Sequence, residues 1–257
     1  GGALALGGND LTVTNDLVVA GALSASATET VTLLGDASFA GAVVSPARSL
    51  LLVAGDRSRV IDFGGADFHG IRVTQGAGTL IVGGGLAADE WRMEIPPGAS
   101  FDCAFAAGRT VCARRFLVLG DAAATNATLR STVPDSAWGL QATEYARVTG
   151  AAVGDSDAAA GITIPAFAAG DAGGNANWDF AAKGGVWTGG GASGDFHDPA
   201  NWAAGVVPGA DTHVVLDTAA AVTITNPVTL RSLTVGGGAV DVACTSDAAL
   251  TVTESIL

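Results

Sequence analysis

The sequence contains little charge, and the charge that it has is mostly negative. Only 14% of its 257 residues are charged, and 25 acidic side chains outnumber 12 basic ones, which include a single lysine, Lys183. The net charge of −13 makes nucleic acid a poor partner, because phosphate binding requires clustered lysine and arginine side chains. No run of about 18 apolar residues without glycine or charge occurs, so we expect no membrane-spanning helix.

Recognised catalytic motifs are also missing. The sequence contains no GxSxG nucleophile motif, no HExxH zinc motif, no phosphate-binding P-loop and no CxxC pair. Its GGG runs at 83–85, 189–191 and 236–238 lack the GxGxxG context of a dinucleotide site. We therefore expect that the chain is not an enzyme and needs no cofactor.

Short alternating segments separated by glycine are abundant instead. Residues 1 to about 95 contain LTVT, TVTLLGD, RVIDFGG and TLIVGGG in close succession, and alternation with β-branched residues predicts strands. No helical period accompanies them, which leaves a sandwich, a barrel or a parallel β-helix. The loose similarity of residues 222–240 to 10–23 and 79–85 favours a right-handed parallel β-helix, an all-β solenoid whose repeats stack coil on coil.

Two tryptophan-containing segments interrupt this pattern. The first ends in NANWDF at 175–180, and the second carries WTG at 187–189, DPANW at 198–202 and VPG at 207–209. The first resembles the closing element, and the second the opening module, of β-helix domains in autotransporter-like bacterial surface proteins. The resemblance implies a β-helix at the cell surface or outside the cell. It carries over no functional residue.

The order of these two segments is rotated relative to that family, in which the opening module precedes the coils and the closing element follows them. We therefore predict three parts. Residues 1–180 form β-helix coils that end in NANWDF, residues 181–217 form an irregular tryptophan-containing insert, and residues 218–257 form further coils that continue into the next copy.

Written end to start, the last residues, ALTVTESIL, and the first, GGALALGGNDLTVT, form one strand pattern. An uncovered coil is a template for another chain, and a head-to-tail contact that does not close into a ring makes a filament. We expect such pairing between copies, although trimmed flanking sequence would give the same pattern. The predicted interface consists of Leu4, Leu6, Leu11, Val13, Leu250, Val252, Ile256 and Leu257.

The three cysteines allow two interpretations. Cys103 and Cys112 flank the turn AAGR, and this spacing would allow a disulfide between adjacent strands in an oxidising compartment. Alternatively, both are buried thiols that act as small apolar residues. Cys244 has no evident partner and is expected in the core.

Two acidic groups are candidates for chemistry. The first could bind calcium or another metal, but turn formation explains it better; it comprises Asp195, His197, Asp198, Asp211 and His213. The second group, Asp155, Asp157 and Asp171, could serve a carbohydrate-active enzyme. Such a site would need exposed aromatic side chains for sugars, whereas we expect Trp91 and Trp138 to pack in the core.

These features together predict a structural protein. We expect a subunit or repeat of an extracellular bacterial filament or surface fibre, which assembles with copies of itself by stacking of terminal coils. A second hypothesis is an autotransporter-like adhesin that binds glycans or surfaces, and a third is a β-helix carbohydrate-active enzyme.

Overall fold

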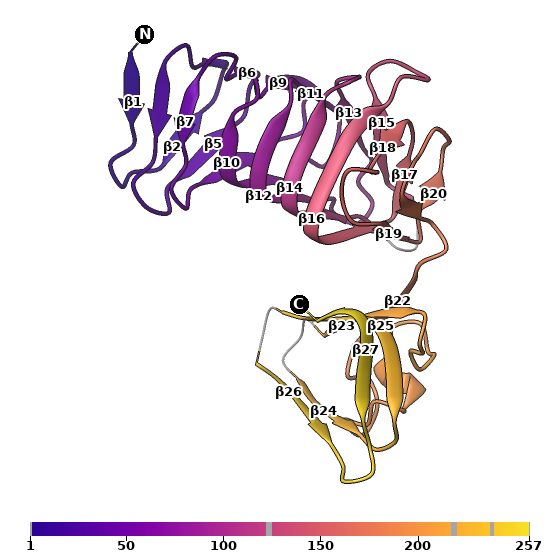
Figure 1. Ribbon diagram of the computed structural model, residues 1–257. Helices are drawn as coiled ribbons and strands as arrows, with labels where there is room; N and C mark the ends of the chain where they lie inside the picture. Colours follow the sequence, from indigo (N-terminus) through magenta and orange to yellow (C-terminus); the bar gives the residue numbers. More distant parts are fainter. Residues whose placement is uncertain (1, 122–124, 217–219, 237–238, 257) are drawn as a thin grey trace. The chain divides into compact units, whose positions relative to one another are not determined.

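A computed structural model describes residues 2–121, 125–216, 220–236 and 239–256 (Figure 1). The chain divides into two compact units, Gly1–Phe180 and Ala181–Leu257. Both are built from parallel strands stacked in successive coils, which confirms the prediction of an all-β parallel β-helix. The described residues contain no helix that is long and apolar enough to cross a membrane.

The first unit is a solenoid with sheets on its sides. Each coil adds a strand to each sheet that it passes, except that β18 and β19 both pair with β16. The first sheet contains β1 (Ala3–Ala5), β4 (Ala22–Ser24) and β7 (Val43–Ser45). The second contains β2 (Leu11–Val13), β5 (Thr30–Leu33), β8 (Leu50–Val53), β10 (Asp67–Val73), β12 (Leu86–Glu94), β14 (Thr110–Leu119), β16 (Trp138–Thr149), β18 (Ser156–Asp157), β19 (Ile164–Phe167) and β21 (Trp178–Asp179). The third contains β3 (Leu17–Val18), β6 (Ala37–Ser38), β9 (Arg59–Asp62), β11 (Thr79–Gly83), β13 (Phe101–Phe105), β15 (Ala127–Ser131), β17 (Ala151–Val153) and β20 (Gly170–Asp171).

A regular step relates the early coils of the second sheet. Leu11 pairs with Val31, Val31 with Leu51 and Leu51 with Ile71, so each coil advances the register by 20 residues. Because side chains alternate across a strand, the residues at these paired positions point inward, whereas their neighbours along each strand point outward. The alternation that predicts strands therefore also sets which side chains fill the interior.

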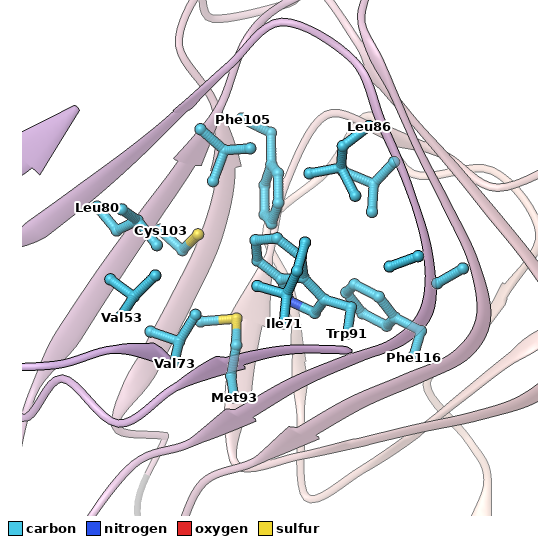
Figure 2. Close-up of a cluster of buried hydrophobic side chains, with 14 of the residues drawn as sticks. Val53, Ile71, Val73, Leu80, Leu86, Trp91, Met93, Cys103, Phe105 and Phe116 are labelled. Atoms are coloured by element: carbon cyan, nitrogen blue, oxygen red, sulfur yellow. The ribbon is translucent and has the colours of Figure 1, made fainter. Parts of the chain in front are cut away.

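An aromatic stack occupies the middle of this interior. Trp91 packs against Phe63 and Phe105, and the ring of Phe105 stacks on Trp138 with centroids 4.0 Å apart. Trp91 and Trp138 are fully buried, as predicted, so neither offers a surface for sugars. Figure 2 shows Trp91 between Phe105 and Phe116 among aliphatic side chains.

The second unit is a shorter solenoid. One sheet contains β22 (Lys183–Val186), β23 (Thr212–Leu216), β25 (Val228–Val235) and β27 (Leu250–Ile256), and the other contains β24 (Ala220–Ile224) and β26 (Val240–Cys244). A short 3-10 helix spans Pro199–Asn201. Residues 181–217, predicted as an irregular insert, thus contribute β22 and β23 to the same sheet as the coils that follow.

Candidate functional site: open and closed ends of the coils

The first coil, formed by β1, β2 and β3, has an open side. Each of these strands lies at the edge of its sheet, and no strand pairs with the free side of the coil within the described residues (Figure 1). Leu11 and Val13 are only partly buried, whereas Val31 and Leu33 directly behind them are 4% and 0% exposed. Leu4 of β1 is 42% exposed. The inward rows of the solenoid therefore reach this edge uncovered.

The opposite end of the first unit is closed by asparagine side chains. Asn175 donates its Nδ2 to the Val153 carbonyl at 2.7 Å and accepts the Ser156 N–H at 3.1 Å. Asn177 donates its Nδ2 to the carbonyls of Ala158 and Gly161 at 2.9 and 3.2 Å. These amides satisfy backbone groups that a further coil would otherwise pair.

Two aromatic rings complete this closure. The Trp178 indole N–H donates to the Ser156 hydroxyl at 3.1 Å, and the ring stacks on Phe180 with centroids 5.9 Å apart. Both rings pack against the interior cluster of the first unit. NANWDF therefore acts as an end cap, which gives the segment a structural role.

The second unit begins with a similar closure. Trp187, Phe196 and Trp202 are 2–3% exposed, with ring centroids 5.0 Å apart for the two tryptophans and 4.8 Å for Phe196 and Trp202. The Trp202 indole N–H donates to the Phe196 carbonyl at 2.7 Å. Together these rings form one end of the interior of the second unit.

Asn201 holds the loop of this opening module together. Its fully buried amide donates to the carbonyls of Ser193 and Asp195 at 2.8 Å and accepts the Gly191 N–H at 2.8 Å. Asp198 caps the 3-10 helix by accepting the Ala200 N–H at 2.9 Å. The DPANW sequence thus encodes a helix cap, a buried amide and a core indole.

The last coil, formed by β26 and β27, is open like the first. Both strands lie at sheet edges in the described part of the chain. Leu250 and Val252 are half-buried, although their neighbours Val228 and Leu230 are 8% and 0% exposed. Ile256 is 66% exposed. Leu257, the remaining member of the predicted interface, lies outside the described residues, and Leu6 is already buried within the first unit.

The cysteines are free thiols, and no disulfide joins Cys103 to Cys112. Cys103 is buried on β13, whereas Cys112 lies half-buried on β14 in a different sheet and contacts the Gln141 side chain at 3.4 Å. Burial raises the pKa of the Cys103 thiol. Cys244, expected in the core, is exposed. It pairs with the buried Ile224, so it belongs to an inward row that no described residue covers.

The side chains of the first candidate metal group each contact separate local partners. Asp195 accepts the His197 N–H at 3.0 Å, and His197 Nε2 lies 3.1 Å from the Asn226 carbonyl. Asp211 forms an ion pair with Lys183, whose hydrogen bond lowers the pKa of the Asp211 carboxyl. No group of three side chains suited to metal binding is found where the chain is described.

His213 and the second acidic group also have local partners. His213 Nδ1 lies 2.8 Å from the Ser232 hydroxyl. Asp157 accepts the Ala159 N–H at 3.0 Å, Asp171 accepts the Gly173 N–H at 2.9 Å, and Asp155 accepts the Asp135 N–H at 3.3 Å. The three carboxylates shape their turns, and the contacts do not link them into an acid–base pair.

A charged row that sequence reasoning missed crosses the second sheet. His69 Nδ1 lies 2.8 Å from Asp89, Arg114 contacts Asp89 at 3.3 Å, and Arg114 binds both oxygens of Glu144 at 2.8 and 2.9 Å. Although burial opposes it, hydrogen bonds from His69 and Arg114 lower the pKa of the Asp89 carboxyl. Three members of the row, His69, Asp89 and Arg114, line a groove that also includes Arg48.

Most of the row is solvent-exposed, so each pair stabilises the fold only slightly. Its sequence signal is weak because the spacing is 20 residues from His69 to Asp89 but 25 from Asp89 to Arg114.

No protein-family model, curated protein or solved structure matches the chain. The coil ends and the charged row are therefore the features that bear on its function.

Proposed function

We propose that the chain is a structural subunit or repeat of an extracellular bacterial filament or surface fibre, which assembles by stacking its terminal coils on those of other copies. This proposal rests on one observation, namely which coil ends of the two units are covered and which are open. The closing element at 175–180 and the opening module at 187–202 cover the coils near the middle of the chain, whereas β1, β2 and β3 and then β26 and β27 leave their edges free in the described residues.

Free edges favour association for two physical reasons. Their backbone N–H and C=O groups can form the same ladder that joins the internal coils. Covering Leu11, Val13, Leu250 and Val252 would also remove apolar surface from water. Burying a fully exposed side chain of this kind is worth about 1.5–3 kcal/mol, and each of these half-buried side chains would contribute a part of that. The cost of ordering the two edges is small, since both already belong to folded coils.

The surface chemistry fits an extracellular fibre. The net charge of −13 keeps neighbouring fibres apart by repulsion. The resemblance of NANWDF and DPANW to segments of bacterial surface proteins supports the location outside the cell. The exposed large hydrophobic side chains are aliphatic in the described residues, as suits a surface without an aromatic platform for sugars.

Electron microscopy of the purified protein without any partner tests the proposal. We expect filaments, whereas discrete particles at all concentrations would contradict it. Val18 provides a matched pair of variants: Leu17 and Val19 donate to Asp36 and Ser38, so the Val18 N–H points to the free edge. Val18→Pro removes this donor and should abolish filaments, whereas Val18→Ala retains it and should assemble.

The groove beside His69 and Arg48 favours a second candidate function, glycan binding by an adhesin. It combines exposed cationic and anionic side chains over several coils. A glycan array probed with the wild type and with Arg114→Ala tests this function separately. Binding that disappears in the variant, in a protein that forms no filaments, would favour the adhesin.

A further inference from the structure

We infer that β2 of one copy pairs in parallel with β27 of a second copy in one defined register. Leu11 lies against Leu250, Thr12 against Thr251 and Val13 against Val252. This inference rests on the proposed assembly and specifies how the two open coils meet.

The two strands carry the same sequence, Leu-Thr-Val-Thr, at residues 11–14 and 250–253. In both, leucine and valine are half-buried and point inward, and the first threonine is exposed. Parallel pairing in register therefore continues the leucine and valine rows of both interiors. A slip by one residue would turn every inward side chain outward, which excludes the neighbouring registers.

The same register aligns a second side of the coil. Leu17 of β3 follows Leu11 by 6 residues, and Ile256 follows Leu250 by 6 residues. Both point inward, because Leu17 pairs with the buried Ala37 and Ile256 pairs with the buried Leu233. A register shift in the pairing of β25 with β27 between Leu230 and Ser232 separates this second side from the first. Stacking would therefore cover Ile256, which is 66% exposed.

The third side of the coil, formed by β1 in one copy and β26 in the other, is consistent with the same register. Leu4 of β1 precedes Leu11 by 7 residues, and Val242 of β26 precedes Leu250 by 8. The internal coils show the same range, since Leu23 precedes Val31 by 8 residues. Leu4 therefore falls opposite Val242, and β1 pairs with β26. Cys244, two residues further along β26, becomes covered by the second copy.

This pairing produces a solenoid shared by two copies. It would run from the opening module of one copy, through the last coil of that copy and the first coil of the next, to the closing element of the next. Both ends of the shared solenoid carry a tryptophan cap, Trp202 at one and Trp178 at the other. The uncovered coils of the separate copies become internal.

Cross-linking between single-cysteine variants tests the register. Thr12→Cys and Thr251→Cys are made separately in a Cys112→Ser, Cys244→Ser background, mixed and oxidised. Thr12 and Thr251 are exposed and point outward, so neither change disturbs an interior. Neighbouring residues of paired strands lie within disulfide reach, and we expect a covalent dimer on a non-reducing gel.

Thr14→Cys mixed with Thr251→Cys is the matched control. Thr14 lies two residues further along, about 6.6 Å at 3.3 Å per residue, and paired strands lie about 4.8 Å apart. The two Cα atoms would therefore be about 8 Å apart, which is beyond disulfide reach, so this pair should not cross-link. Thr12→Cys alone should also remain monomeric under denaturing conditions. Circular dichroism of each variant verifies that it is folded before mixing.

The outcomes separate the register from the proposed function. Filaments that cross-link through Thr14→Cys, or through neither position, would overturn the register but leave the fibre intact. Absence of both filaments and cross-links would overturn both. In the otherwise unmodified protein, Cys244 should react with a thiol reagent more slowly in filaments than in Val18→Pro, and equal rates would contradict its burial by a second copy.

Discussion

The carboxylate of Glu29 in the second coil accepts the backbone N–H of Gly8 in the first coil at 2.8 Å. The same carboxylate accepts the Ser26 N–H at 2.9 Å, the Ser26 hydroxyl at 2.7 Å and the Ala27 N–H at 2.7 Å. One buried acidic side chain thus accepts the hydrogen bonds of backbone N–H groups in the turn of its own coil, and it also links the open first coil to the second.

Glu29→Gln should destabilise the first unit at neutral pH. Hydrogen bonds from Ser26, first its N–H and then its hydroxyl, lower the pKa of Glu29 far below its ordinary value. A lowered folded-state pKa contributes stability that is fully present above the unfolded pKa of about 4.3 and is lost as the pH falls further. Urea unfolding should therefore show a lower midpoint for the variant at pH 7 and a smaller difference at pH 3. Asp67→Asn, which removes an exposed carboxylate, controls for charge; a pH-independent difference would contradict the assignment.

Gly150→Ala should be much more destabilising than Gly108→Ala. Both glycines have positive φ, 64° and 67°, so each alanine costs about 1–2 kcal/mol in backbone strain. At Gly150 a Cβ would also lie 2.3 Å from the Asp121 carbonyl, whereas at Gly108 it meets nothing within 4 Å. Overpacking should add about 1–3 kcal/mol at Gly150. Chemical denaturation measures the difference, and equal losses would contradict this explanation.

Asn201→Ala should loosen the second unit and leave the first unchanged. The substitution leaves two carbonyls and one N–H of the opening module without their partner, at about 1–3 kcal/mol for each buried group left unsatisfied. Hydrogen exchange followed by mass spectrometry should show faster exchange only in 181–257. Asn226→Ala, an exposed amide of the same unit, should exchange like the wild type. Equal acceleration in both units would mean that they unfold together.

The three thiols should react in a fixed order with Ellman's reagent. Cys244 is exposed and Cys112 half-buried, while Cys103 is buried and its pKa is raised by that burial. We expect fast, slow and undetectable reaction, respectively, in the folded monomer, and three equivalents after unfolding. Only one reactive thiol in unfolded protein without reductant would instead indicate the Cys103–Cys112 disulfide.

The sequence was sufficient to predict the fold because its repeating signal is local. Alternation in LTVT and TVTLL sets the inward rows, and short steps between similar segments indicate stacking. Leu11 pairs with Val31, and Val31 with Leu51, so the alternation within each segment places inward residues on one another. The coil ends could also be located, since NANWDF and DPANW stand out from the strand pattern.

Contacts between coils of unequal length could not be predicted. The step is 20 residues between β10 and β12 but 25 between β12 and β14, and a bulge interrupts the pairing of β14 with β16. Arg114 therefore meets Asp89 and Glu144 at separations without a regular period. The cysteines illustrate a related difficulty: consecutive strands of a solenoid turn into different sheets, so the spacing of Cys103 and Cys112 does not make them neighbours.

The gradient of exposure along the inward row from Leu11 to Val31 and Leu51 has a consequence for unfolding. Each coil of the stack contacts only the coils beside it. Within the described residues the first coil is held by one neighbour, whereas internal coils are held by two. Unfolding of the first unit should start with fraying of β1 to β3 and proceed coil by coil toward Trp178 and Phe180. The first unit would then lose its structure from one end, in a direction set by where its asparagine and tryptophan cap lies.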